Sequence, residues 1–275
     1  MAKPAVLIVG ADKGGVGKTT VSRTLLDYFA AHQIPTRAFD TEAPKGTLKR
    51  FYPDAAEIVD MNLVPDQMKI FDTLSGSHAS VTIIDVRAGL LSPTLQSLRD
   101  IGFIEAAKKG QITFGLFHIL GPTITSLDEI SETAAYLGDA KYFMVKNFIN
   151  NTHYFQWDEQ TCAAYFKKVK DAVEITIPKL NEMACEQVDL ASVPYLSFIA
   201  NKKLSGDAAS YSFVLRGYVR HWLGNVWAEY DRIKLTDVVG AKPQGSETAP
   251  VGAKAPTGET GLALQRERPK VQAAG

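Results

Sequence analysis

The sequence predicts an α/β fold of three layers, in which helices cover both faces of a doubly wound, mostly parallel sheet. Residues 5–9 form a continuous run of β-favouring apolar residues, which is typical of a strand buried on both faces. Comparable runs return along the chain and alternate with segments of helical periodicity. The length of 275 residues and the 45% share of hydrophobic residues favour one large domain with a full core.

The first strand is followed by a glycine-rich turn and then by a helix whose apolar face contains Leu25, Leu26 and Phe29. The pattern predicts further strands at residues 36–40, 80–85, 111–120, 141–149 and 173–177. It predicts further helices at about residues 66–75, 92–109, 125–138, 159–171 and 179–190. We expect the first crossover to be right-handed, as nearly all such connections are.

A long amphipathic helix is expected from Asp207 to about Lys234. Its apolar stripe consists of Tyr211, Val214, Leu215, Tyr218, Val219, Trp222, Leu223, Val226, Trp227 and Tyr230. Such a wide stripe usually packs on a core, although it can also form a partner or membrane surface. The composition then shifts to Gly, Pro, Ala, Thr and Lys, which bury too little apolar surface to order a segment. We therefore expect a domain of residues 1–235 and a disordered tail of residues 236–275.

Charge and cysteine content narrow the classes of function. Lys plus Arg and Asp plus Glu both number 30, so any binding to nucleic acid needs a local basic patch. Cys162 and Cys185 form no CxxC pair, which leaves a zinc or iron–sulfur site without support and favours reduced thiols in the cytoplasm. No run of about 18 apolar residues occurs, so we expect no membrane span.

The turn after the first strand carries the strongest motif, which reads Lys13-Gly14-Gly15-Val16-Gly17-Lys18-Thr19-Thr20. The common phosphate-loop pattern begins with Gly, but here Asp12 occupies that position. A different pattern, Lys-Gly-Gly-x-Gly-Lys-Thr-Thr, matches in full. In this loop the chain resembles the ParA/MinD family of deviant Walker A, or signature-lysine, P-loop ATPases. The resemblance implies a SIMIBI-type P-loop NTPase fold over about residues 4–235, with ATP and Mg²⁺ as bound cofactors.

The chemistry of phosphate binding explains these residue types. Glycines allow turn conformations that direct several backbone N–H groups at phosphates, and the N-terminus of the next helix adds partial positive charge. Lys18 is expected to reach the β- and γ-phosphates and the Thr19 hydroxyl to bind magnesium. The resemblance places Thr20 near the α-phosphate. The loop residues expected to contact the nucleotide are Asp12, Lys13, Gly14, Gly15, Val16, Gly17, Lys18, Thr19 and Thr20.

Lys13 is the residue that distinguishes this family from other P-loop proteins. The resemblance implies that it crosses a nucleotide-sandwich homodimer, formed on ATP binding, and touches the partner subunit's phosphates. A cation supplied from the other subunit can stabilise transition-state charge as an arginine finger does. The alternative is a lysine without a function in a glycine turn, but the strand before and the helix after support the functional interpretation.

Two acidic residues follow the second strand, in Asp40-Thr41-Glu42-Ala43-Pro44. The family typically has Asp-x-Asp-Pro there, so Asp40 matches and Glu42 replaces the second Asp. The resemblance implies a catalytic set of Lys13, Lys18, Asp40 and Glu42, with Asp40 also in the metal shell and the second acid positioning the attacking water. Glu42 is equally well a solvated loop carboxylate, and the departure leaves the rate of hydrolysis open.

Asp85 ends the strand at residues 80–85 and matches the Walker B acid, which holds magnesium through water. A helix cap is the alternative role for an Asp at a strand end. The family's γ-phosphate-sensing switch follows at this point, but Val86 and Arg87 stand where Thr-Pro is usual. Arg87 is therefore open to three interpretations, as a phosphate contact, a partner contact or a surface arginine.

Recognition of the base rests on the resemblance alone. In relatives an Asn at the end of a late strand reads adenine, and Asn147 fits this position, with Asn150 and Asn151 as alternatives. A loop after a further strand stacks on the base, and Pro178 with Lys179 fits that segment.

The family resemblance also implies what the nucleotide switch is for. We expect a ParA-like ATPase, slow without a partner, whose ATP-bound dimer positions or segregates plasmid, chromosome or other cargo DNA and is stimulated by a ParB-like or other partner protein. The variant switch motifs indicate an outlying branch, like the accessory ATPases of plasmid stability and conjugation. Binding to non-specific DNA, and through it to the nucleoid, would use a set of basic residues. The alternative interpretation of the same residues is an ordinary solvated surface. These residues are Lys167, Lys168, Lys170, Lys202, Lys203, Arg216, Arg220, His221, Arg232 and Lys234.

Two other functions share this fold. A MinD-like positioning ATPase would act at a membrane or protein scaffold, but residues 261–269 are short, weakly apolar and broken by Pro269, which does not favour a membrane anchor. An ATP-dependent ligase or synthase would need a substrate pocket that the sequence does not reveal. The iron-protein reductases need cluster cysteines near the switch, and this chain has none there.

Overall fold

The computed structural model describes residues 3–121, 124–137, 140–149 and 172–241. Their strands form a seven-stranded sheet in the order β3-β2-β4-β1-β5-β6-β7, and every neighbouring pair is parallel. The strands are β1 (Ala5–Gly10), β2 (Thr36–Asp40), β3 (Ala56–Ile58), β4 (Val81–Asp85), β5 (Thr113–Leu120), β6 (Lys141–Asn147) and β7 (Val173–Ile177). The order reverses at β1, which confirms the predicted doubly wound sheet.

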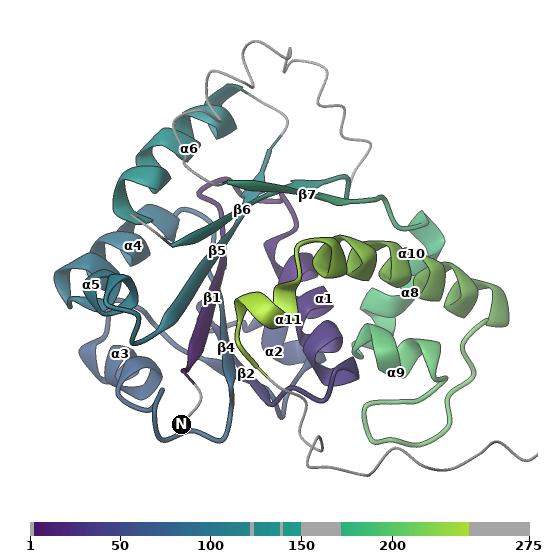
Figure 1. The fold of residues 1–275 in the computed structure, drawn as a ribbon. Helices are drawn as coiled ribbons and strands as arrows, with labels where there is room; N and C mark the ends of the chain where they lie inside the picture. The colour runs from purple at the N-terminus through teal and green to yellow at the C-terminus, as the bar shows by residue number, and fades with distance from the viewer. Residues whose placement is uncertain (1–2, 122–123, 138–139, 150–171, 242–275) are drawn as a thin grey trace, which may run out of the picture. The chain divides into compact units, whose positions relative to one another are not determined.

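Helices cover both faces of the sheet and complete the predicted three layers (Figure 1). One face carries α3 (Val64–Phe71), α4 (Leu91–Asp100), α5 (Phe103–Lys108) and α6 (Ile124–Leu137). The other carries α1 (Lys18–Ala31), α2 (Thr47–Phe51), α8 (Glu182–Ala191), α9 (Tyr195–Ile199), α10 (Phe213–Arg232) and α11 (Leu235–Val238). None of the helices in these ranges is long and apolar enough to cross a membrane.

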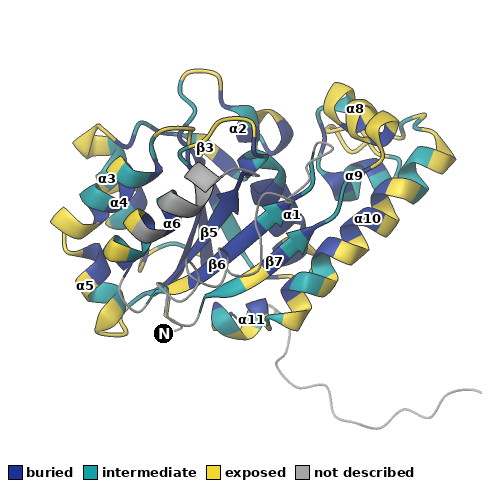
Figure 2. Ribbon diagram, turned by 90° about the horizontal axis from the view of Figure 1, so that it is seen from above, coloured by how far each residue is buried: buried dark blue, intermediate teal, exposed yellow. Residues whose placement is uncertain are grey.

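The position of the central strand β1 explains why polar and apolar residues do not alternate in its sequence. Leu7 and Val9 pack into the core under α1 and α10, whereas Val6 and Ile8 pack into the core under α4 and α5. Successive side chains of a strand point to opposite faces, so a strand covered on both sides needs apolar residues at every position. The two buried layers are visible on either side of the sheet from above (Figure 2).

Several elements differ from the prediction. The helix expected at residues 92–109 is two helices, because Gly102 adopts a left-handed conformation (φ 79°) between α4 and α5. The short elements α2, β3 and α9 were not predicted, since three to five residues carry too little periodicity. The helix expected at residues 159–171 lies outside the described residues, as do Cys162 and the basic cluster from Lys167 to Lys170.

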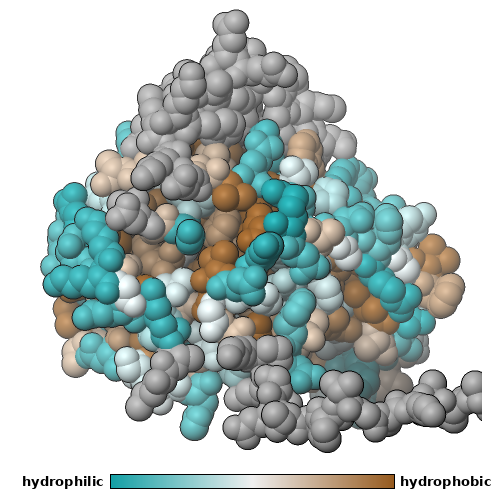
Figure 3. Space-filling view, in the orientation of Figure 1, coloured by the Kyte–Doolittle hydropathy of each residue, from teal (hydrophilic) through white to brown (hydrophobic). Residues whose placement is uncertain are grey.

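The long helix α10 begins later than predicted, at Phe213, where the Ser212 hydroxyl accepts a hydrogen bond from the Leu215 amide. The second half of the predicted stripe packs on the core as expected. Val214 and Tyr218, at its beginning, are exposed together with Phe213, which is 78% exposed. Hydrophobic atoms are visible at the end of the molecule where α10 begins (Figure 3).

The compact unit continues beyond α10 through α11 to the buried side chains of Val239 and Ala241. These residues belong to the segment expected to start the disordered tail. The remainder of that segment, residues 242–275, lies outside the described residues.

Helix α10 is joined to the nucleotide-loop helix α1 by buried hydroxyl groups, which yields a first test. The Tyr230 and Thr24 hydroxyls are 2.7 Å apart, and both residues are buried. We expect Tyr230→Phe to lower the free energy of unfolding by about 1 kcal/mol, the usual net value of such a hydrogen bond. Chemical denaturation measures this, and Tyr218→Phe, at an exposed position of the same helix, serves as the control. Equal stability of the two variants would contradict this account of the packing.

Candidate functional site

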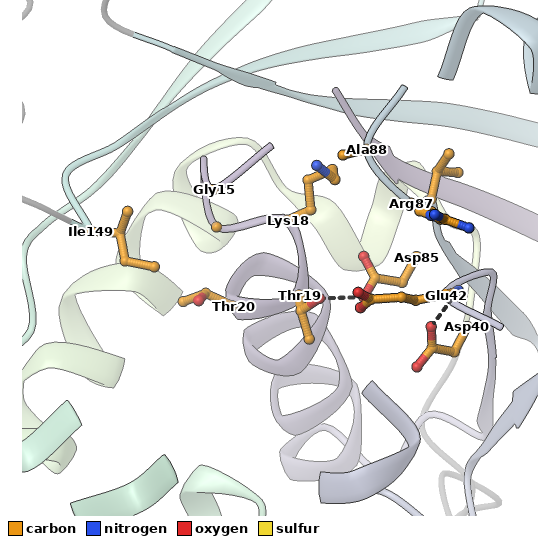
Figure 4. Close-up of a pocket in the computed structure, with 12 residues that line it drawn as sticks. Gly15, Lys18, Thr19, Thr20, Asp40, Glu42, Asp85, Arg87, Ala88 and Ile149 are labelled. Carbon is orange, nitrogen blue, oxygen red and sulfur yellow. Dashed lines mark hydrogen bonds between the residues drawn. The ribbon is translucent and has the colours of Figure 1, made fainter. Parts of the chain in front are cut away.

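A cavity of about 340 Å³ opens at the carboxyl edge of the sheet, where the loops after β1, β2, β4 and β6 meet. It is lined by the loop and first turn of α1, by Asp40 at the end of β2, by Glu42, by residues 85–88 and by Ile149 (Figure 4). In open parallel sheets, ligands bind at this edge and at the strand where the order reverses. The sequence-predicted loop and carboxylates are therefore brought together at one site.

The loop between β1 and α1 has the backbone that its glycines predict. Gly15 and Gly17 have positive φ angles of 71° and 87°, which residues with a side chain rarely adopt. Gly17 lies directly before the first residue of α1, so the helix N-terminus faces the cavity mouth.

The Lys18 side chain lies over this loop. Its Nζ donates a hydrogen bond to the carbonyl of Lys13 at 2.9 Å, and only 9% of the residue is exposed. Burial lowers the pKa of Lys18, while the nearby carboxylates of Asp85 and Glu42 oppose that shift. The ammonium group is thus held in the cavity among backbone and carboxylate oxygens.

Asp85, the predicted Walker B acid, is linked to α1. Its Oδ2 accepts a hydrogen bond of 2.8 Å from the Thr19 hydroxyl, and its Oδ1 is buried. Burial raises the pKa of Asp85 to about 7 and the neighbouring Asp40 adds to this shift, whereas the hydroxyls of Thr19 and Ser22 oppose it. A buried carboxylate beside a threonine hydroxyl can hold a magnesium ion together with water molecules and phosphate oxygens.

Asp40, expected in the catalytic set and the metal shell, has both carboxylate oxygens engaged by backbone groups. Oδ1 accepts from the Glu42 amide at 2.9 Å, and Oδ2 accepts from the amides of Leu48 and Lys49 at 2.6 and 3.1 Å. These last two amides lie in the first turn of α2, so Asp40 caps that helix. The interaction orients the loop that carries Glu42, a role that sequence reasoning missed.

Glu42 lies in the cavity wall. Its carboxylate accepts a hydrogen bond from the Thr47 hydroxyl at the start of α2. The side chain is therefore oriented by the protein and is not a freely solvated loop carboxylate.

Asp12 was expected to contact the nucleotide, but its carboxylate faces helix α4. Oδ1 accepts from the amides of Leu91 and Ser92 at 3.0 and 3.4 Å, and Oδ2 accepts from the Ser92 hydroxyl at 2.7 Å. The Asp12 carbonyl also accepts from the Gly89 amide at 2.8 Å. Asp12 thus connects the phosphate loop to the segment that follows Asp85, and it does not line the cavity.

Asn147 and Pro178 are expected near the base, and the structure shows which groups they contact in the protein without nucleotide. The Asn147 amide donates to the carbonyls of Val16 and Gly17 at 3.1 and 3.4 Å. A Cβ atom on Gly17 would lie 2.2 Å from Asn147 Nδ2, which explains glycine at this position independently of its φ angle. Pro178 is outside the cavity lining, and its carbonyl accepts from the Trp222 indole at 2.7 Å. The alternatives Asn150 and Asn151 lie outside the described residues.

Lys13 is exposed and does not line the cavity of its own chain. The described basic residues of the predicted DNA surface differ in their surroundings. Those that are exposed are Lys202, Lys203, Arg220, His221, Arg232 and Lys234. Arg232 pairs with Glu229, and Arg216 is half-buried and donates to the Ile199 carbonyl.

The contacts of Asn147 predict a positioning role that differs from reading adenine. We expect Asn147→Ala to weaken binding of ATP and GTP analogues by the same factor, about tenfold for two lost hydrogen bonds, because the loop backbone contacts phosphates common to both. Calorimetric titration with each nucleotide measures this. Asn225→Ala, exposed on α10, is the control. A selective loss of ATP binding would instead restore the base-reading role.

No family model matches the chain, and no curated protein matches it. Solved structures do match. The septum site-determining protein MinD of Pyrococcus horikoshii, complexed with Mg-ADP, is 15% identical and covers 86% of this chain and 98% of its own, with a TM-score of 0.48. A ParA family ATPase from Chlorobium tepidum is 12% identical over 80% of this chain and 97% of its own, with a TM-score of 0.47. A nucleotide-binding protein of Archaeoglobus fulgidus in complex with ADP is 16% identical over 67% and 85%, with a TM-score of 0.46. Two of these proteins carry the names of the family that the loop sequence resembles.

Proposed function

We propose that the protein is an ATPase of the ParA/MinD type, a switch that binds ATP with magnesium, dimerises and hydrolyses ATP slowly until a partner stimulates it. The observation that carries this proposal is the cavity that Lys18, Thr19, Glu42 and Asp85 line together with a glycine loop. A loop of backbone N–H groups with a buried lysine suits a polyphosphate, and the acids beside it suit a metal ion.

Nucleotide and metal would be bound by separate sets of residues. The backbone of residues 14–19 and the Lys18 ammonium bind the phosphates, while Thr19 and Asp85 hold the hydrated magnesium ion. When bound, magnesium neutralises charge on the β- and γ-phosphates. Glu42, fixed by Thr47, lies where an acid can orient a water molecule toward the terminal phosphate.

Dimerisation would be the output of nucleotide binding. An exposed Lys13 at the rim of the loop can reach the phosphates of a second subunit but does not line its own cavity. A contact that exists only when the terminal phosphate is present biases the protein between two states, as in other nucleotide switches. We propose plasmid, chromosome or other cargo DNA as the object that this switch positions, with a ParB-like protein as one class of stimulating partner.

Binding of DNA by the dimer would use exposed basic residues of α10 and of the segment before it, which are Lys202, Lys203, Arg220 and His221. Contacts of this kind are made to phosphates and are sequence-neutral, so affinity falls steeply with salt concentration. Dimerisation doubles the number of such residues in one assembly, which couples DNA binding to the nucleotide.

The raised pKa of Asp85 predicts how magnesium binding depends on pH. A metal ion requires the ionised carboxylate, whose pKa in the free protein is about 7. We therefore expect the affinity of the ADP complex for magnesium to be constant above about pH 8 and to fall by up to about tenfold per unit below pH 7. Titration with Mg²⁺ between pH 6 and pH 8 measures this. In Asp85→Asn binding is weaker and keeps only the pH dependence of the ADP phosphates; a pH profile that is the same in both proteins would rule out Asp85 as the titrating group.

The dimerising switch itself is tested through Lys13. We expect light scattering after size exclusion to show a dimer with a non-hydrolysable ATP analogue and magnesium, and a monomer with ADP. Lys13→Ala remains monomeric with both nucleotides while still binding them. Lys45→Ala, at another exposed loop lysine, behaves as the wild type. Non-specific DNA is bound by the dimer alone, and more weakly as salt rises. A wild-type monomer in every state would contradict the proposal and favour a small-molecule ligase or synthase.

A further inference from the structure

We propose that Arg87 binds the terminal phosphate of the nucleotide within its own subunit and thereby makes the site prefer ATP to ADP. The inference rests on the proposed nucleotide-binding function and adds a residue to it. It concerns the loop after β4, which forms one wall of the cavity opposite the phosphate loop. Arg87 is drawn with the other lining residues in Figure 4.

The backbone of Arg87 is held at the cavity by Thr41, which follows β2. The Arg87 amide donates to the Thr41 hydroxyl oxygen at 2.8 Å. The Thr41 amide and hydroxyl in turn donate to the carbonyl of Asp85 at 3.0 and 3.2 Å. Thr41 is only 4% exposed, so this bridge between the loops after β2 and β4 is shielded from water. The bridge fixes the backbone from which the Arg87 side chain extends, two residues after Asp85, the carboxylate proposed to hold the metal.

The position of the terminal phosphate follows from the groups around it. Lys18 comes from the phosphate loop and would contact the β- and γ-phosphates, while Thr19 and Asp85 would hold magnesium. A γ-phosphate would therefore lie between the phosphate loop and the end of β4, beside the lining residues 86–88. A group on this wall would contact the phosphate that ATP has and ADP lacks.

Acidic side chains outnumber basic ones in the cavity lining. Three carboxylates line it, those of Asp40, Glu42 and Asp85. Among the described lining residues the positive side chains are Lys18 and Arg87. Together with a bound magnesium ion, these two side chains would offset the three acids and the added negative charge of a γ-phosphate. A guanidinium group presents several donors in a fork that matches phosphate oxygens.

The Arg87 side chain is available for such a contact. It is exposed and makes no hydrogen bond or ion pair with the described residues. Other arginines of the sheet region are engaged. Arg37, for example, donates to Thr82, Thr73 and the carbonyl of Ile70. An arginine whose backbone is fixed and whose head group is unengaged is suited to bind an incoming anion.

The test compares affinities for Mg-ATPγS and Mg-ADP by titration calorimetry. For Arg87→Ala we expect the ratio of the two affinities to fall by about tenfold or more, with ADP affinity unchanged, because a charge-assisted contact to the γ-phosphate is lost. Arg87→Lys keeps the charge and recovers part of the ratio. Arg99→Ala, at an exposed arginine on α4 outside the cavity lining, leaves both affinities unchanged.

The bridge at Thr41 supplies an independent variant. Thr41→Val removes the hydroxyl group that fixes Arg87 and lowers the same ratio, whereas Thr41→Ser keeps the hydroxyl and the wild-type ratio. Melting temperatures show whether the variants fold. If Arg87→Ala leaves the ratio unchanged, or weakens ADP and ATPγS equally, Arg87 does not bind the terminal phosphate, although nucleotide binding by the wild type still supports the proposed function. A wild type that binds neither nucleotide overturns both.

Discussion

The hydrogen bond between the Thr19 hydroxyl and the Asp85 carboxylate joins the two parts of the molecule on which the site depends. Thr19 lies in the first turn of α1, and Asp85 ends β4, the strand that pairs directly with β1. Because β1 is buried on both faces at the centre of the sheet, the loop that follows it has a rigid origin. The remaining groups of the cavity are arranged around this contact, with Lys18 on one side and Glu42 and Arg87 on the other.

The phosphate loop is held in place by neighbouring elements as well as by its own glycines. Asn147 bonds to its carbonyls from the end of β6, and Asp12 connects its beginning to α4. Asp40 and Thr41 hold the loops after β2 and β4 in place. Asp40 does so by bonding to α2, and Thr41 by bonding to the Asp85 carbonyl. A site built in this way needs little rearrangement to accept a polyphosphate, which reduces the free energy spent on ordering during binding. The same hydrogen bonds join the cavity to α2 and α4.

The features that could be predicted from the sequence are those marked by a short run of neighbouring residues. The buried strands, the glycine loop and the carboxylates at strand ends each have a continuous signature, and the structure places them as expected. The roles of Asp12, Asp40 and Asn147 have no such signature, since each depends on which backbone groups the fold brings within 3.4 Å of the side chain. The division of one predicted helix at Gly102 and the exposed start of α10 likewise depend on tertiary packing. Asp40 can be recognised as a helix cap only once α2 is known to begin at Thr47.

Direct titration of the wild-type protein with ATP, with and without magnesium, tests the central claim that this cavity is a magnesium–nucleotide site. The account predicts saturable binding of one ATP per chain, tighter with magnesium than without it, and loss of that binding in Lys18→Ala with the fold retained. Binding that is independent of magnesium and unaffected by Lys18→Ala, or no binding at all, would contradict it.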